Sequence, residues 1–248
     1  MTIPRIRYDS AIDDSAIISG HDLHYLKDIL RLREGEDVFL IAPNGEFRGH
    51  IRAIGEHEIA INIVDKIIRK QSECRITLAQ SLLKADKMEF VVQKLCELGI
   101  SSLIPFISQR TISRPDKEKS LVKREKWEKI SSEAARKSLR SEATVVKPVI
   151  GFEEMLLAPP ATCVKAICWE EEESLTLKEF FATIAFPSAS TIFFVIGPEG
   201  GFTKEEISIA RGKGFSSVSL GKALLKAETA AIATAAIIAY LTGHLGDK

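Results

Sequence analysis

The chain has 248 residues, of which 45% are hydrophobic and 27% are charged, a composition typical of globular proteins. Its 34 basic and 34 acidic residues cancel, which argues against a protein that coats nucleic acid with its whole surface. The sequence has no apolar run of membrane-spanning length and no signal-peptide core, so we expect a cytoplasmic protein.

Disulfide and metal chemistry are not expected from the cysteines and histidines. The four cysteines, Cys74, Cys96, Cys163 and Cys168, form no CxxC pair, and the five histidines have no ligand spacing. Reduced thiols and no bound metal are therefore predicted.

Residues 1–72 are predicted to form a small β-rich unit. Asn44-Gly45 is a strong hairpin signal because both residues tolerate the positive φ angles of a tight turn. This turn separates the first two of three predicted strands, which span residues 38–41, 47–54 and 58–64.

One amphipathic helix is predicted before these strands, over residues 20–33, with an apolar stripe of Leu23, Leu26, Ile29 and Leu30. The same helix carries the cations Lys27, Arg31 and Arg33. These cations either contact phosphate groups or form an ordinary solvated helix end.

The charged and polar residues 66–74 are the predicted boundary, so that a second domain spans residues 73–248. Strands and helices alternate beyond it, which predicts an α/β fold with a parallel sheet. The strands are predicted at residues 76–83, 100–107, 161–169, 191–196 and 216–220. The helices are predicted at residues 86–98, 117–139, 203–214 and 228–241, the second of them in a stretch rich in Lys and Arg.

The strand at 191–196 ends in Gly197-Pro-Glu-Gly-Gly201. Proline supplies no amide for a sheet, and paired glycines let the backbone approach a ligand closely. Thr203 and Glu206 have the spacing of a capping box, which predicts a helix start. This arrangement is either a ligand-binding loop at the carboxyl end of a strand or a simple tight turn.

A second loop, residues 221–227, follows the next predicted strand. The two strands are expected to be neighbours, which puts both loops at one sheet edge where their amides surround one ligand, with Trp169-Glu170 as a third contributor. The sequence has no GxxxxGK[ST] and no GxGxxG pattern, so a mononucleotide-like ligand without a pyrophosphate suits these loops better than a dinucleotide.

Five sequence blocks occur in the order found in one enzyme family. They are residues 24–35, 84–99, 105–110, 126–140, and the loop pair Ile196-Gly-Pro-Glu-Gly-Gly-Phe-Thr203 and Leu220-Gly-Lys-Ala-Leu-Leu-Lys-Ala-Glu-Thr-Ala230. Over nearly its whole length the chain resembles the SPOUT-class 16S ribosomal RNA (uracil-N3)-methyltransferases, the RsmE family.

The resemblance implies an N-terminal PUA-like β-barrel that holds RNA, in residues 1–72. It also implies a SPOUT methyltransferase domain in residues 73–248, with helices on both faces of the sheet and a C-terminal trefoil knot. S-adenosylmethionine is the implied cofactor, and the small ribosomal subunit with its 16S ribosomal RNA is the implied partner. A homodimer is expected as well.

The resemblance also assigns site residues. The catalytic candidates are Arg110, Glu199 and Lys226. The cofactor-binding candidates are Trp169, Ile196, Gly197, Pro198, Glu199, Gly200, Gly201, Ser219, Leu220, Gly221, Leu224, Leu225, Glu228, Thr229 and Ala230. The RNA-binding candidates are Lys27, Arg31, Arg33, Arg110, Arg136 and Arg140.

Two roles follow from the implied reaction. The proton on uridine N3 needs an acceptor, for which Glu199 and Glu228 are the nearby carboxylates in sequence. Glu228 is better explained as a helix cap, and Glu199 either accepts the proton or holds the cofactor or the loop. A cation stabilises the charge that develops on the uracil ring, and Arg110 is preferred over Arg114, an exposed loop charge.

The second loop departs from the family pattern, because Ala223 and Lys226 stand where the family usually has arginines. Lysine keeps the charge but not the bidentate fork of arginine. This departure favours one alternative, a non-catalytic RNA-binding or ribosome assembly factor. The other alternative is a different SPOUT enzyme, which methylates a transfer RNA ribose, because the same loops would serve it.

Overall fold

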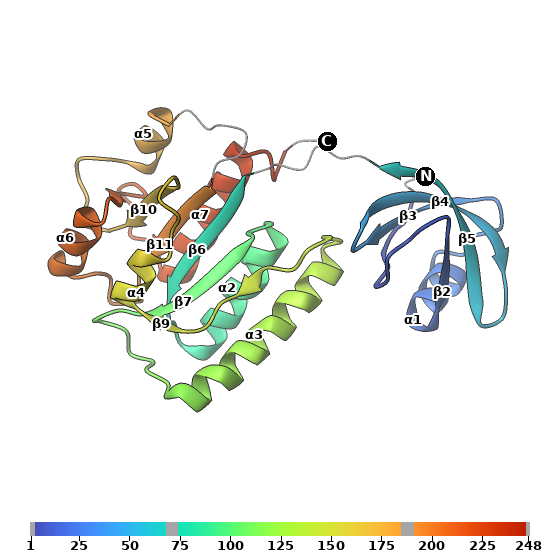
Figure 1. Ribbon diagram of the computed structural model, residues 1–248, viewed down its shortest axis with the longest axis horizontal. Coiled ribbons are helices and arrows are strands. Elements are labelled where there is room, and N and C mark those ends of the chain that lie inside the picture. The colour runs from blue at the N-terminus through green and yellow to red at the C-terminus, as the bar shows by residue number, and fades with distance from the viewer. Residues whose placement is uncertain (1–2, 68–73, 185–190, 247–248) are drawn as a thin grey trace. The chain divides into compact units, whose positions relative to one another are not determined.

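The structure is a computed structural model that describes residues 3–67, 74–184 and 191–246. The chain divides into two compact units, one of residues 1–70 with 135–142 and one of residues 71–134 with 143–248. Figure 1 labels most of their elements. The boundary predicted between residues 72 and 73 lies outside the described residues.

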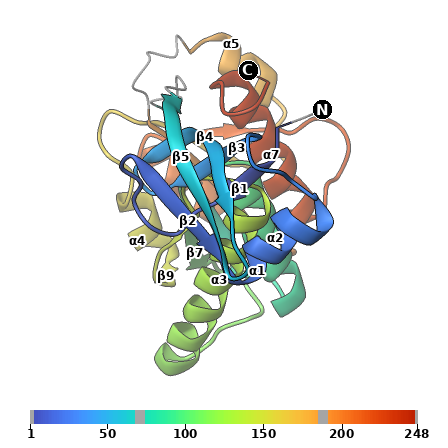
Figure 2. The same ribbon diagram turned by 90° about the vertical axis from the view of Figure 1, so that its right-hand side faces the viewer.

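The N-terminal unit contains a five-stranded sheet in the order β1-β3-β4-β5-β2. Its strands are β1 (Arg5–Arg7), β2 (Ser15–Ser19), β3 (Asp37–Ala42), β4 (Gly45–Ile54) and β5 (Glu58–Ile67). β1 and β3 are parallel and the other pairs are antiparallel. The sheet curls beside a short helix, α1 (Gly20–His24), as Figure 2 shows.

The predicted hairpin is confirmed, since Ala42 pairs with Gly45 where β3 turns into β4. Asn44 contributes more than turn geometry, because its side chain accepts from the Ile12 amide and donates to the Ile12 carbonyl. The first two strands were not predicted, because β1 is only three residues long and β2 only five.

The prediction of one helix over residues 20–33 is wrong beyond Ile29. After α1 the chain widens into a π-helical segment, η1 (Tyr25–Ile29), and Arg31 then adopts a φ of +54°. A left-handed residue reverses the chain direction and ends a helix. Of the predicted apolar stripe, Leu26 is fully buried, whereas Ile29 is 60% exposed.

The C-terminal unit contains a seven-stranded parallel sheet in the order β12-β10-β11-β6-β7-β8, with β9 paired to β7, which confirms the predicted sheet type. Its strands are β6 (Arg75–Ser81), β7 (Ser102–Ile107), β8 (Val145–Val146), β9 (Ile150–Gly151), β10 (Val164–Cys168), β11 (Thr191–Ile196) and β12 (Ser216–Val218). Its helices are α2 (Ala85–Glu97), α3 (Lys117–Lys137), α4 (Phe152–Leu157), α5 (Leu177–Ala182), α6 (Lys204–Gly212) and α7 (Ala227–Leu241).

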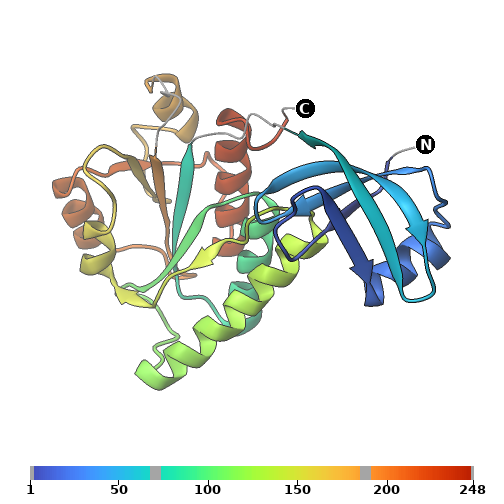
Figure 3. The ribbon, with the colours of Figure 1, turned by 45° about the vertical axis from the view of Figure 1, so that its right-hand side comes forward.

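Helices cover both faces of this sheet (Figure 3). Alternate side chains of β11 enter two separate cores. Phe194 belongs to the core that includes α2, α3, α5 and α7, whereas Phe193 belongs to the core that includes α4 and α6. A strand buried on both faces needs apolar residues throughout, which explains the unbroken run at 191–196. The trefoil knot stays a prediction from the resemblance.

The strand order corrects one expectation. β11 and β12 are not neighbours, because β10 lies between them and pairs with both. Pairing partners are set by long-range topology, which spacing along the chain does not report. The loops that follow these two strands therefore flank the end of β10, where Trp169 lies.

Candidate functional site

The glycine-rich loop, residues 197–201, is held at the carboxyl end of the sheet by side chains from other segments. Gln80, fully buried at the end of β6, donates from Nε2 to the Gly197 carbonyl at 3.0 Å. Glu199 accepts from the Lys84 amide, at the start of α2, at 3.4 Å. The loop then passes into α6 through the predicted capping box of Thr203 and Glu206, which is confirmed.

Gly201 is required in this loop for two reasons. Its φ is +67°, and a Cβ atom there would lie 1.8 Å from Oε1 of Glu170. The backbone of the loop thus touches the end of the exposed Glu170 side chain, which would have to move to admit a Cβ atom, so the positive φ is the stronger requirement for glycine.

The second loop follows β12 and leads into α7. Its first residue, Ser219, accepts at its carbonyl from the Leu177 amide and donates from its amide to the Leu175 carbonyl. Its hydroxyl also accepts from the Gly221 amide, where φ is +110° and a Cβ atom would meet open space. The loop ends at Lys226, the residue that precedes α7.

The two loops and the end of β10 enclose a cavity of about 630 Å³. Its lining residues are Lys87, Cys168, Trp169, Glu170, Ile196, Gly197, Pro198, Glu199, Gly201, Ser219, Leu220, Gly221, Lys222, Ala223, Leu224, Leu225, Lys226, Ala227 and Ala230. The volume is within the range of small-molecule sites, roughly 300–1,000 Å³. The cavity thus lies at the carboxyl end of the parallel strands, where open α/β sheets bind ligands.

Most residues predicted to bind cofactor or react line this cavity, and four do not. Gly200 faces Arg110 instead, Thr229 is exposed on α7, and Glu228 turns toward Lys87. Arg110 lies beside the glycine-rich loop and donates from Nη1 to the Gly200 carbonyl at 3.0 Å.

Sequence reasoning missed Lys87 and Cys168 as lining residues. Lys87 Nζ lies 3.5 Å from Glu199 and 3.3 Å from Glu228, so one ammonium joins α2, the glycine-rich loop and α7. Burial raises the pKa of Glu228, but its own amide and Lys87 outweigh burial, and the pKa is lowered overall. Lys87 lies within residues 84–99, one of the five blocks that carry the resemblance, and this was the sequence signal that could have identified it.

Cys168 is a wall of the cavity and not a nucleophile. Burial raises the pKa of this thiol to about 12, so the reactive thiolate is absent at neutral pH. Among the described residues, no group of three metal-ligating side chains is found.

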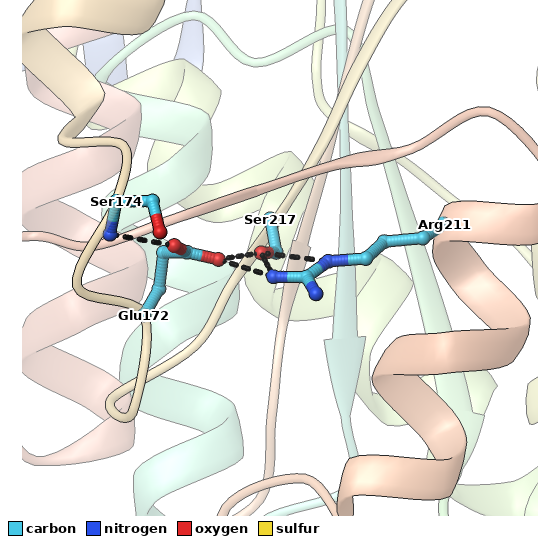
Figure 4. Close-up of polar contacts among 4 residues, drawn as sticks. All are labelled: Glu172, Ser174, Arg211 and Ser217. Atoms are coloured by element: carbon cyan, nitrogen blue, oxygen red, sulfur yellow. Dashed lines mark hydrogen bonds and ion pairs between the residues drawn. The ribbon is translucent and has the colours of Figure 1, made fainter.

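An ion cluster around the buried Glu172 holds the segment of residues 169–174, whose first two residues line the cavity (Figure 4). Glu172, 6% exposed, accepts from the Ser174 amide at 2.8 Å, from Arg211 of α6 at 2.6 Å and from the Ser217 hydroxyl of β12. Burial raises the pKa of Glu172, but these hydrogen bonds outweigh burial and lower it. The Arg211 guanidinium also lies 5.8 Å above the Trp169 ring.

The residues present fit an adenosine-like cofactor. Within the described residues, Nε1 of Trp169 is buried without a hydrogen-bond partner, although it lies at the cavity. Ile196, Leu220, Leu225 and Ala230 supply apolar walls. Unpaired buried donors are rare, and this one is available to a ligand acceptor in the cavity.

The predicted RNA-binding cations are distributed over several elements. Lys27 donates to the Gly55 carbonyl at 3.0 Å, and Arg31 and Arg33 are exposed. Arg136 is exposed at the end of α3, and the Arg140 carbonyl accepts from Arg7.

In the described residues, no helix is long and apolar enough to cross a membrane.

Two family models match the chain. The RNA methyltransferase domain matches residues 70–239, and the RNA methyltransferase PUA domain matches residues 18–64. The second match confirms the predicted PUA-like character of the N-terminal unit.

Similar proteins cover nearly the full length of the chain. The ribosomal RNA small subunit methyltransferase E of Rickettsia conorii is 30% identical, over 98% of both chains. That of Bacillus subtilis is 28% identical, over 93% of this chain and 92% of its own. The structure of a ribosomal RNA small subunit methyltransferase E from Neisseria gonorrhoeae, bound to S-adenosyl methionine, has a TM-score of 0.74 and 28% identity, covering 97% of this chain and 98% of that one. The chain therefore belongs to the family of RNA methyltransferases with a PUA domain.

Proposed function

We propose that this protein transfers the methyl group of S-adenosylmethionine to N3 of a uridine in 16S ribosomal RNA. The observation that carries the proposal is the cavity at three strand ends, in a chain similar over its full length to a relative solved with S-adenosyl methionine. A ribosomal substrate implies that the protein acts in the cytoplasm.

The cofactor supplies an activated methyl group, so the protein's main task is alignment. Peptide groups of residues 197–201 and 219–226 hold the adenosine part, and Trp169 donates from its unpaired Nε1. Glu199 is fixed between the Lys84 amide and Lys87, where it holds the glycine-rich loop and faces the cavity. Its position suits either an acceptor of the N3 proton or a cofactor contact.

Arg110 and Lys226 are the proposed catalytic cations. Lys226 lines the cavity, and Arg110 is anchored by one hydrogen bond to the glycine-rich loop. Either guanidinium or ammonium stabilises negative charge on a uracil ring once N3 is deprotonated. The loss of a cation at Ala223 is partly offset by Lys222, which also lines the cavity.

The N-terminal unit and the Lys- and Arg-rich α3 are proposed to bind the RNA backbone. PUA character and exposed cations such as Arg31, Arg33 and Arg136 support this role. Phosphate contacts of this kind release counterions, so RNA affinity falls steeply with salt concentration.

A homodimer is proposed from exposed apolar side chains on two adjacent helices. Phe90 of α2 and Ile237, Tyr240 and Leu241 of α7 are between 43% and 69% exposed. Exposed apolar side chains mark an association site where they form one contiguous patch, and such a patch over α2 and α7 is proposed here.

The function is tested by methylating RNA and locating the methyl group. Small-subunit RNA from cells that lack the protein is incubated with labelled cofactor, as free RNA and as whole subunits, and mapped by mass spectrometry. One methylated uridine N3 is the expected product. A ribose 2′-O-methyl product identifies the other enzyme class, and cofactor binding without methylation identifies a non-catalytic RNA-binding factor.

Arg110→Ala separates chemistry from binding. Turnover is expected to fall by roughly 10²-fold, the size seen when one charge-stabilising donor is removed, with cofactor affinity within about threefold of wild type. Single-turnover kinetics and titration calorimetry measure the two quantities. Unchanged turnover would remove Arg110 from the proposed mechanism.

A further inference from the structure

Glu206 is placed to do more than cap a helix. It is 6% exposed, and its two carboxylate oxygens accept from two different segments. Oε2 accepts from the Thr203 amide at 3.0 Å, which is the local capping bond. Oε1 accepts from the Gln109 amide at 2.8 Å, and this bond leads to a loop that begins after β7.

That loop, residues 108–114, is called the Arg110 loop here. Buried hydroxyls close it at its base, where Thr111 Oγ1 accepts from the Ser108 amide at 2.8 Å and lies 2.8 Å from Ser81 Oγ. Arg114 closes it from outside by donating to the carbonyls of Ser108, Gln109 and Thr111 at 2.7–3.2 Å. The Arg114 side chain is exposed, as predicted, and it also braces the loop through these three hydrogen bonds.

The Arg110 loop and the glycine-rich loop are in direct contact. Arg110 donates to the Gly200 carbonyl, and a Cβ atom on Gly200 would lie 3.2 Å from the Arg110 Cβ. The backbone amide of Gln109, the neighbour of Arg110, donates a hydrogen bond to Glu206. Glu206 thus fixes the backbone beside Arg110 to the helix start that follows the glycine-rich loop.

We propose that Glu206 is a positioning residue for the methyl transfer, holding the Arg110 loop and the glycine-rich loop as one unit so that Arg110 is correctly placed. The proposal rests on the role given above to Arg110. A small displacement of a catalytic group lowers turnover strongly, whereas ground-state cofactor binding is less sensitive.

Glu206→Gln is the test, because it keeps size and shape but turns one acceptor into a donor. Turnover is expected to fall at least tenfold, with cofactor affinity within threefold of wild type. Glu179→Gln is the matched control. Glu179 makes the same capping box with Thr176 on α5, and among the described residues its side-chain hydrogen bonds stay within that box, so turnover should stay within twofold of wild type.

A double-mutant cycle with Arg110→Ala distinguishes positioning from general damage. If Glu206 acts through Arg110, Glu206→Gln lowers turnover less than twofold once Arg110 is absent. An equal fold-loss in both backgrounds would overturn the proposal, as would wild-type turnover in Glu206→Gln. If Glu206→Gln does not fold, Arg114→Gln releases the same loop and enters the cycle in its place.

Proteolysis tests the proposal without any activity. Arg114 precedes Pro115, which blocks trypsin, so cleavage in the Arg110 loop occurs after Arg110. Its initial rate is expected to rise at least threefold in Glu206→Gln and to be unchanged in Glu179→Gln. Equal rates in all three proteins contradict the proposal. If the three proteins show these relative cleavage rates but the wild-type protein does not methylate RNA, the proposed function alone is refuted.

Discussion

Single residues decide the shape of the cofactor cavity, and Gly201 is the most constrained of them. Its positive φ is one that L side chains rarely adopt, and a Cβ atom there would displace the Glu170 carboxylate. Gly221 differs, because its φ of +110° is also reserved for glycine but the space around it is open. Both positions belong to the loops on which the proposed cofactor site depends.

Gly201→Ala is expected to weaken S-adenosylmethionine affinity by roughly tenfold or more, because a left-handed alanine costs about 1–2 kcal/mol before any clash. Calorimetric titration measures the change. Gly212→Ala, on α6 where nothing lies within 4 Å of the added Cβ, is the control and should bind normally. Wild-type affinity in Gly201→Ala would show that the glycine-rich loop does not shape the site.

At the scale of elements, the cavity depends on how α6, β12 and the segment after β10 are joined. The Glu172 cluster joins all three, and it lies directly behind Trp169. Arg211→Gln leaves a carboxylate that is 6% exposed without its cation. Loss of a hydrogen bond to a charged group is expected to lower the free energy of unfolding by about 1.5–3 kcal/mol at pH 7, near the lower end here because Arg211 is half exposed.

The loss should depend on pH. The folded-state pKa of Glu172 is lowered, so its stabilisation is complete above the unfolded value of about 4.3 and disappears as pH falls through the folded pKa. The difference between wild type and Arg211→Gln should therefore shrink below about pH 4. Urea unfolding across pH 3–7 measures it. Lys204→Gln breaks the neighbouring exposed pair with Glu171 and should change stability by less than about 1 kcal/mol.

Elements with strong local patterns were predictable, and those fixed by distant contacts were not. The strand at 191–196 and the capped α6 follow from continuous apolar character and from Thr203 with Glu206. The two-residue strands β8 and β9 carry no periodic signal, and the six-residue α4 is too short for one. α5 was missed although Thr176 and Glu179 form the same capping box as α6.

The candidate site shows the same division. Both loops were predicted from their glycines and the strands before them, because these signals are local. Lys87 and the bracing role of Arg114 were not, since their partners lie in other segments. The place of β10 between β11 and β12 was missed for the same reason.

At the scale of the whole molecule, association of two copies is the step on which the proposed active form depends. Tyr240→Glu, at a side chain 69% exposed on α7, is expected to yield monomers because it puts a charge into an apolar contact. Sedimentation velocity measures the change. Leu157→Glu, at a residue 67% exposed on α4 on the opposite face of the sheet, should leave the association state unaltered. A wild-type protein that is monomeric at tens of micromolar rules out the dimer.

The central claim is that peptide groups at three strand ends hold the methyl donor, and a crystal structure of the protein grown with S-adenosylmethionine tests it most directly. The expected result is the nucleoside between residues 197–201 and 219–226, with an acceptor atom at hydrogen-bond distance from Trp169 Nε1. A nucleoside bound anywhere else, with these loops in contact only with solvent, would contradict the account.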